Sequence, residues 1–407
     1  MDQLRLWDEE PEPVRRTLGQ KVCIALSLIV LAVGLVGLAL SCCPARRRVP
    51  EVPDLPLVPR PIEEPATVRV LLRTAPTLTA AVSTRGTWRD AEGRATLAAP
   101  PGGGPWTVGT QGGSLTLDGR PLGVPAAELQ PARGYVRLEG REYRGSLLMR
   151  ADDGAVRAVN VVPPEDYLRS VVAAEMYVNW PMEALMAQAV AARTYMLYTV
   201  LREKGYLTTI DMAYGGRSVE TGATDLAVKL TEDVALTYAG DLFSAYFHST
   251  CGGHTISVDR VFNYEPIPPL RGGPCGWCEP SPAYEWKATF TPEEIRRALG
   301  GDGPQSIREV AAVGAEAHDY ADSVLINQQV EVDAYRLRLA LGGGKVKSTW
   351  FRVERVGDEF VFSGRGYGHG VGLCQWGAWG MAGDGYSWQQ ILRHYYPGAA
   401  IERIGGE

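Results

Sequence analysis

Residues 163–205 read PPEDYLRSVVAAEMYVNWPMEALMAQAVAARTYMLYTVLREKG, and this stretch decides the fold prediction. In its first part, Tyr167 and Val171 are four residues apart, a spacing that places side chains on one face of a helix. A second helix is predicted after Pro181, because proline suits the first turn of a helix. Its apolar residues recur on one stripe: Leu185, Ala189, Ala192 and Met196. The predicted end of this helix is Lys204-Gly205.

Residues 67–163, before these helices, are predicted to be rich in β-strands. Short runs such as TVRVLLR, YVRLEG and AVRAVNVV alternate apolar and polar residues between Gly/Pro turns. Beyond the helices, strand-like runs return around 234–250 and from 331 to 362, with a helix near 291–299 and another in SWQQILRHYYPG. The predicted fold class is therefore α+β, a β-rich part followed by a mixed helical and β core over 164–405.

Composition narrows the class of partner. The chain has 407 residues, 45% of them hydrophobic and 22% charged, which is typical of globular proteins. The formal net charge is −6, and no basic run is long enough to form a nucleic-acid surface. Nucleic-acid binding is therefore disfavoured, whereas an uncharged polysaccharide remains compatible.

The N-terminal region predicts membrane attachment. After a tail at 1–21, residues 22–40 read VCIALSLIVLAVGLVGLAL without a charge, a span of about 28 Å as a helix. We expect a transmembrane or signal-anchor segment at 22–41, favoured over lipoprotein processing at Ser41-Cys42-Cys43. Residues 44–66 contain seven prolines and predict an extended spacer between membrane and domain.

Glu175 is the first candidate for chemistry. It follows the first predicted helix, among Val172, Met176, Tyr177 and Trp180. Apolar neighbours could desolvate the carboxyl group and favour its protonated form, which can protonate a leaving oxygen. The alternative is a solvated carboxylate at a helix end.

A second candidate is a metal site. His248 and Cys251 are separated by two residues, as are Cys275 and Cys278. Paired two-residue spacers with Cys and His ligands predict a closed, structural zinc site. His254 is a possible substitute ligand, and a disulfide is the alternative interpretation, since extracytoplasmic compartments oxidise thiols.

The third candidate is the glycine-rich stretch at 364–377, GRGYGHGVGLCQWG. It lacks the Lys-Ser/Thr of a phosphate-binding loop. Its glycines could let the backbone lie close to a substrate, with His369, Gln375 and Trp376 at the site. The alternative is a structural turn. A Cys374 nucleophile paired with His369 is disfavoured, because no third group is seen to orient the pair.

Three separated segments together resemble the stage II sporulation protein D (SpoIID/LytB) family: residues 163–195, 245–255, and 364–382 with 391–398. The resemblance runs from about Val68 to Ile401. It implies a peptidoglycan lytic transglycosylase that cleaves MurNAc-GlcNAc bonds of strands lacking stem peptides and leaves 1,6-anhydroMurNAc ends. The family also includes amidase enhancers, so the alternative is a glycan-binding protein that stimulates an N-acetylmuramoyl-L-alanine amidase.

The resemblance also implies residue roles. The family's catalytic acid falls on Glu175, and its AQAVAARTY helix makes Gln188, Arg193 and Tyr195 site supports. Some members of the family bind zinc through a histidine and cysteines. The resemblance therefore implies His248, Cys251, Cys275 and Cys278 as zinc ligands. The catalytic domain is expected outside the cytoplasmic membrane, with peptidoglycan and a cell-wall amidase as partners. A role in sporulation is analogy with the family alone.

Overall fold

The computed structural model describes residues 62–405, except 92, 94, 98–101, 263, 301–302 and 315–319. The predicted tail, membrane segment and most of the proline-rich spacer lie outside the described residues. Within the described part of the chain, no helix is long and apolar enough to cross a bilayer. The membrane segment therefore stays a prediction.

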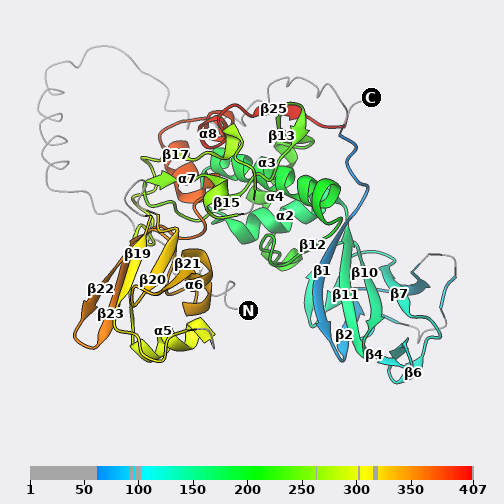
Figure 1. The fold of residues 1–407 in the computed structure, drawn as a ribbon. Helices are drawn as coiled ribbons and strands as arrows, with labels where there is room; N and C mark the ends of the chain where they lie inside the picture. The colour runs from blue at the N-terminus through cyan, green and yellow to red at the C-terminus, as the bar shows by residue number, and fades with distance from the viewer. Residues whose placement is uncertain are drawn as a thin grey trace, which may run out of the picture. The chain divides into compact units, whose positions relative to one another are not determined.

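The N-terminal part consists of strands arranged in two sheets, each with six strands (Figure 1). One sheet has the order β12-β1-β11-β10-β7-β3, the other β6-β5-β4-β2-β8-β9. Alternating apolar residues point into the space between them, where Trp88 and Trp106 meet edge to face at 5.9 Å. The strands are β1 (Val68–Ala75), β2 (Leu78–Val82), β3 (Gly86–Asp90), β4 (Trp106–Gln111), β5 (Ser114–Leu117), β6 (Arg120–Pro121), β7 (Ala126–Pro131), β8 (Val136–Leu138), β9 (Arg141–Tyr143), β10 (Ser146–Asp152), β11 (Ala155–Val162) and β12 (Leu207–Thr208).

A group of helices follows, with α3 (Met182–Tyr198) at its centre. Alanines let neighbours approach α3 on nearly every side, and it contacts α2 (Pro164–Glu175), α4 (Gly222–Leu230), α7 (Gln375–Gly383) and α8 (Trp388–Tyr395). Helix α3 continues into a π-helical turn at Thr199–Glu203 before Gly205, which has φ of +72°. The three-stranded sheet β14-β13-β25 joins Asp241–Leu242 and Val234–Tyr238 to the C-terminal strand Ala400–Arg403.

Several short elements lie between the larger ones along the chain, before and after a small α+β unit. They are η4 (Arg217–Val219), β15 (Phe247–His248), β16 (His254–Thr255), η5 (Val258–Arg260), η6 (Pro268–Leu270), β17 (Gly273–Pro274) and β24 (Leu373–Cys374). The unit itself contains β18 (Glu285–Phe290), α5 (Pro292–Leu299), β19 (Val310–Val313), β20 (Ser323–Ile326), β21 (Val330–Asp333), α6 (Ala334–Leu341), β22 (Phe351–Val356) and β23 (Glu359–Arg365). Its two three-stranded sheets share one apolar core that includes Phe290, Val324, Leu337 and Phe362.

The α+β class is confirmed, as is its β-rich character. One local prediction is wrong, because the run from 331 to 362 contains helix α6 as well as strands. The Asp333 side chain accepts a hydrogen bond from the Arg336 N–H and caps this helix. Capping and a helical spacing of Leu337 and Leu341 outweigh the strand-like appearance of the run.

Candidate functional site

Glu175 is the last residue of helix α2. The helix begins with Pro164 and carries Glu165 and Asp166 in its first turn, where the helix dipole favours acidic groups. It ends because Met176 adopts an extended conformation. That break turns the chain toward Trp180 and leaves Glu175 at the border of the core.

The carboxyl group of Glu175 accepts one hydrogen bond on each oxygen. The Ala213 N–H donates to Oε1 at 2.6 Å, and Nε2 of Gln375 lies 3.4 Å from Oε2. The residue as a whole is half-buried, whereas its carboxyl group lies among buried neighbours. Desolvation raises the pKa of Glu175 above its ordinary value, and the two donors oppose that rise in part. The group can therefore hold a proton at a higher pH than an exposed glutamate.

Two glutamines connect this carboxyl group to helices α3 and α7. Nε2 of Gln375 lies 3.4 Å from both Oε2 of Glu175 and Oε1 of Gln188. Both glutamines are buried, and Nε2 of Gln188 has no partner among the described residues. Since Glu175 and Gln375 are 200 positions apart, the long-range packing of α3 against α7 assembles this group.

Aromatic residues occur in the two chain segments that carry Glu175 and Gln375. Tyr177 and Trp180 follow Glu175 in the chain, and Trp376 follows Gln375. Trp376 is buried, and its ring centroid lies 5.0 Å from that of Trp180 and 6.1 Å from that of Tyr177. The structure thus brings Glu175, Gln188 and Gln375 together, and Trp376, next to Gln375 in the chain, contacts the rings that follow Glu175.

Arg193 is placed elsewhere. Its guanidinium is fully buried and bonds both carboxylate oxygens of Glu165, at 2.6 and 2.7 Å. It also donates to the carbonyl oxygens of Val234, at 3.1 Å, and Val228, at 3.4 Å. Because every one of these partners belongs to the protein, Arg193 acts as a support that ties α3 to α2 and β13, and no contact among the described residues places it against a substrate.

Tyr195 and His369 are likewise held by groups of the protein itself. The Tyr195 ring packs against Tyr246, with centroids 5.7 Å apart, and no bond to Glu175 is found in the described part of the chain. In His369, Nδ1 accepts from the Val371 N–H at 3.1 Å and Nε2 lies 2.8 Å from the Phe247 carbonyl oxygen. Both ring nitrogens are engaged by backbone, so substrate binding by His369 does not fit these contacts.

The glycines around His369 serve internal packing. Gly372 has φ of +72°, and a Cβ there would lie 2.0 Å from the Tyr246 carbonyl oxygen. A Cβ on Gly370 would meet the Tyr320 ring at 2.8 to 3.0 Å. The close approach that these glycines permit is therefore to the protein's own chain.

Four buried cysteines converge on one point. Sγ atoms of Cys251, Cys275, Cys278 and Cys374 all lie within 4.8 Å of one another. The predicted set contained His248 in place of Cys374, and that part of the prediction is corrected. Nδ1 of His248 instead lies 3.0 Å from the Val371 carbonyl oxygen. Pairing of β15 with β24 sets His248 beside Cys374 in the backbone, and it is the cysteine side chain that points into the cluster.

The thiol cluster fits a tetrahedral metal ion. A zinc ion with Zn–S bonds of about 2.3 Å sets its sulfurs about 3.8 Å apart. Sγ of Cys251 lies 3.5 Å from Sγ of Cys278, a distance close to that value and too long for a disulfide. Sγ of Cys374 accepts from the N–H groups of Cys251 at 3.2 Å and Gly377 at 3.3 Å, and such donors stabilise a thiolate.

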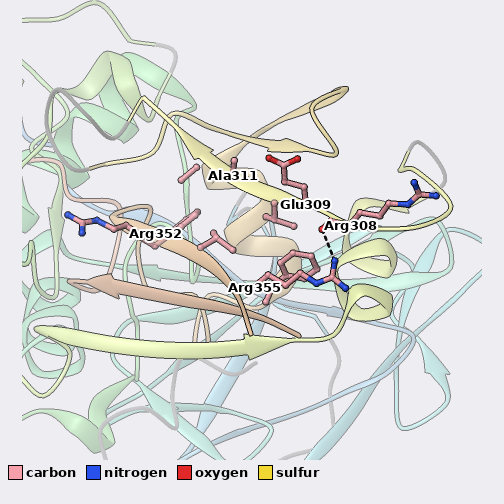
Figure 2. A pocket seen from close by; sticks show the side chains of 10 residues that line it. Arg308, Glu309, Ala311, Arg352 and Arg355 are labelled. Atoms are coloured by element: carbon pink, nitrogen blue, oxygen red, sulfur yellow. Dashed lines mark hydrogen bonds between the residues drawn. The ribbon is translucent and has the colours of Figure 1, made fainter. Parts of the chain in front are cut away.

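A cavity of about 450 Å³ lies in the small α+β unit, between β19 and β22 (Figure 2). Arg308, Glu309, Arg352 and Arg355 line it, and none of the predicted site residues does. Nη1 of Arg355 donates to the Arg308 carbonyl oxygen at 3.2 Å across one end. This cavity is separate from the group around Glu175.

The sequence missed two contributors to these sites. The Ala213 N–H bonds the Glu175 carboxyl group through backbone alone, so no side-chain pattern could have pointed to it. Cys374 did carry a signal, because it was the one downstream cysteine that the predicted ligand set left unassigned.

Comparison with known proteins agrees with the motifs. The sequence model of a family described as Stage II sporulation protein, SpoIID, matches residues 152–238. Stage II sporulation protein D of Bacillus subtilis is 32% identical over 61% of this chain and 76% of its own length. The chain belongs to the stage II sporulation protein D family.

Two other relatives carry different names, one of which refers to an amidase. An uncharacterized protein of Brachyspira hyodysenteriae is 33% identical over 65% of this chain and 73% of its own length. A Bacillus subtilis protein named Amidase enhancer is 27% identical over 74% of this chain, which spans 50% of that relative. The resemblance seen in the motifs is thus confirmed at the level of the family.

Proposed function

We propose that this protein is a lytic transglycosylase that cleaves the MurNAc-GlcNAc bonds of peptidoglycan strands lacking stem peptides. The observation that carries the proposal is the Glu175 carboxyl group, desolvated, raised in pKa and held by one donor on each oxygen. Such a group suits general acid catalysis, which needs a protonated carboxyl near neutral pH.

One carboxyl group can perform both proton transfers. Protonated Glu175 donates its proton to the glycosidic oxygen as the bond from that oxygen to C1 of MurNAc breaks. The C6 hydroxyl oxygen of the same MurNAc forms a bond to C1, and its proton passes to the Glu175 carboxylate. The strand ends in a 1,6-anhydro ring, no water is consumed, and Glu175 regains its starting state.

The surroundings of the other two acidic residues of helix α2, Glu165 and Asp166, support a one-carboxylate reaction. Two-carboxylate glycosidases need a second acid facing the bond that breaks. Glu165 is bound by buried Arg193 at 2.6 Å, and Asp166 lies 3.9 Å from Arg144 and 3.7 Å from Arg169. Both carboxylates are engaged by arginines, and neither bonds Glu175 in the described chain.

The test incubates the full-length chain, beside Glu175→Gln, with purified glycan strands stripped of stem peptides. Mass spectrometry of the products should find anhydroMurNAc ends with the unaltered chain alone. Glutamine keeps the shape and can still accept from the Ala213 N–H, but it cannot donate a proton as an acid. Equal cleavage by the two proteins would remove Glu175 from the mechanism.

A second function has an observation of its own, the relative named Amidase enhancer. In that case the protein would bind glycan and stimulate a cell-wall amidase without cutting the strand. Two results together would favour this role. The unaltered chain would cleave no strands, and it and the Glu175→Gln variant would accelerate the amidase equally.

Metal and location complete the proposal. Cys251, Cys275, Cys278 and Cys374 would hold one structural zinc ion, which would supply cross-linking of their segments and no step of the reaction. The catalytic part would be attached through residues 22–41, whose hydropathy supports a membrane segment, and would lie outside the cytoplasmic membrane, a location that rests on the family resemblance. Protease access to the domain in intact spheroplasts would test the location.

A further inference from the structure

Four aromatic rings, from the segment after Glu175 and the segment after Gln375, form one cluster, named here the aromatic platform: Tyr177, Trp180, Trp376 and Trp379. At its centre, Trp180 and Trp376 lie 5.0 Å apart at an interplanar angle of 70°. Tyr177 contacts both, at 5.2 and 6.1 Å between centroids. Trp379 also contacts both, at 6.3 and 5.3 Å. Tyr177 and Trp379 are therefore two flanks of one tryptophan pair.

Exposure divides the platform in the same way. Trp180 and Trp376 are buried, with 7% and 3% of their surface exposed, whereas Tyr177 and Trp379 are half-buried. The central pair thus fixes the position of the two flanking rings, which retain surface for a ligand. Val178, with 38% exposed, extends the apolar surface next to Tyr177.

Both segments of the platform are adjacent to atoms that touch the candidate acid. Tyr177 is two residues beyond Glu175, and Trp376 directly follows Gln375, whose Nε2 lies 3.4 Å from Oε2 of Glu175. The two segments that carry the platform are therefore the same two segments that carry Glu175 and its partner Gln375. Sites for small molecules are typically lined by aromatic surface with a few polar groups, and these two segments supply both.

The chemistry of such surface selects a class of ligand. A pyranose ring in the all-equatorial form carries its C–H bonds on two flat, apolar faces and its polar groups around the edge. Half-exposed tyrosine and tryptophan rings offer a matching flat surface, rigid and polar only at the rim. Amino sugars linked β-1,4 present such faces along a chain.

We propose that Tyr177 and Trp379 form sugar-stacking subsites on either side of the Trp180–Trp376 pair, and that they bind consecutive N-acetylated amino sugars of the strand so that a glycosidic oxygen reaches Glu175. The inference rests on the proposed function for the nature of the strand. Tyr177 and Trp379 are thereby substrate-binding residues, and the two central tryptophans are positioning residues.

The test measures binding apart from turnover. The full-length chain carrying Glu175→Gln is titrated by calorimetry with the uncharged β-1,4-linked tetramer of N-acetylglucosamine. Adding Trp379→Ala or Tyr177→Ala should weaken binding about tenfold each, the loss of one good aromatic contact. Trp379→Phe and Tyr177→Phe keep a flat ring and should stay within about threefold of the parent. Tyr238→Ala, a half-buried tyrosine of β13 outside the platform, is the matched control and should leave binding unchanged.

The outcomes separate this inference from the proposed function. Unchanged binding in both alanine variants, or no binding by the parent, would overturn the subsites. Equal loss in the phenylalanine and alanine variants would also overturn them, since a flat ring would then not suffice. Normal tetramer binding through Tyr177 and Trp379 with no strand cleavage by the unaltered chain would leave the subsites in place and refute the lytic activity.

Discussion

Replacing Cys374 by serine tests the composition of the proposed metal site. Serine matches cysteine in shape but is a poor zinc ligand, so the change removes one of four sulfurs that lie within 4.8 Å of one another. His248→Asn is the control, because it removes a possible ligand nitrogen while an amide can still donate to the Val371 carbonyl oxygen. The two variants separate a four-cysteine site from one built with His248.

The magnitude follows from the number of ligands. Structural zinc contributes roughly 10–16 kcal/mol in small zinc-dependent folds, so one of four thiolates accounts for about 3 kcal/mol. A further effect arises because Sγ of Cys374 caps α7 by accepting from the Gly377 N–H at 3.3 Å. A serine hydroxyl can take over that cap, so the metal effect should dominate.

The assay combines metal content with unfolding. Elemental analysis of the unaltered chain should find about one zinc ion per chain, as a closed four-ligand site requires. Cys374→Ser should lose zinc to a competing chelator far more readily and unfold at a lower denaturant concentration. His248→Asn should keep its zinc. Full retention of zinc by Cys374→Ser with loss in His248→Asn would refute the four-cysteine site, and a metal-free chain with two disulfides by mass would refute the metal.

Three further predictions concern single residues. Arg193→Leu should lower the free energy of unfolding in urea by about 3 kcal/mol, because it leaves the Glu165 carboxylate and two buried carbonyl oxygens without their donor. A loss below about 1 kcal/mol would contradict the inference that Arg193 holds α3 to α2 and β13. Burial raises the pKa of Glu64 from 4.5 to about 7, so the native state binds its proton more tightly and the unfolding free energy should fall as pH rises from about 4.5 to 7. With allowance for partial exposure this amounts to about 1 kcal/mol. Glu64→Gln should lack this slope, so the difference in unfolding free energy between parent and variant should change by that amount over this pH range. Gln375→Ala should lower kcat about tenfold through loss of orientation, and should also move the alkaline limb of the pH–rate profile upward, because the Gln375 N–H lowers the pKa of Glu175; an unmoved limb would mean that Gln375 acts by packing alone.

The fold could be predicted where pattern and local chemistry agree. Helix α5 begins at Pro292, after the cap residue Thr291, and α8 begins after Ser387, and both were expected from spacing. The helix α6 was missed because its capping residue, Asp333, ends a strand and the alternation of β21 reads on into the helix. The local pattern of apolar residues alone does not reveal where the two-residue period of a strand ends and the 3.6-residue period of a helix begins.

The candidate site was predictable only in part. Glu175 and Gln375 lie in motifs that local sequence marks, but the hydrogen bond from the Ala213 N–H depends on a loop that no spacing rule brings to α2. Arg193 illustrates the reverse difficulty. A helical wheel places Arg193 at the border of the apolar stripe of α3, yet the packing of α2 and β13 encloses its side chain completely. Membership of a motif therefore did not distinguish a residue that meets substrate from one that holds helices together.

The contact between Glu175 and Gln375 spans 200 positions of the chain. During synthesis from the N-terminus, the segment with the acid emerges long before the segment with its partner glutamine and Trp376. The last strand, β25, must also pair with β13 beside the central helix. An unfinished or truncated polypeptide thus has an acid without its orienting group or half of its aromatic surface. If the proposed cleavage holds, an incomplete chain would therefore lack part of its site and should cut glycan strands more slowly than the finished protein.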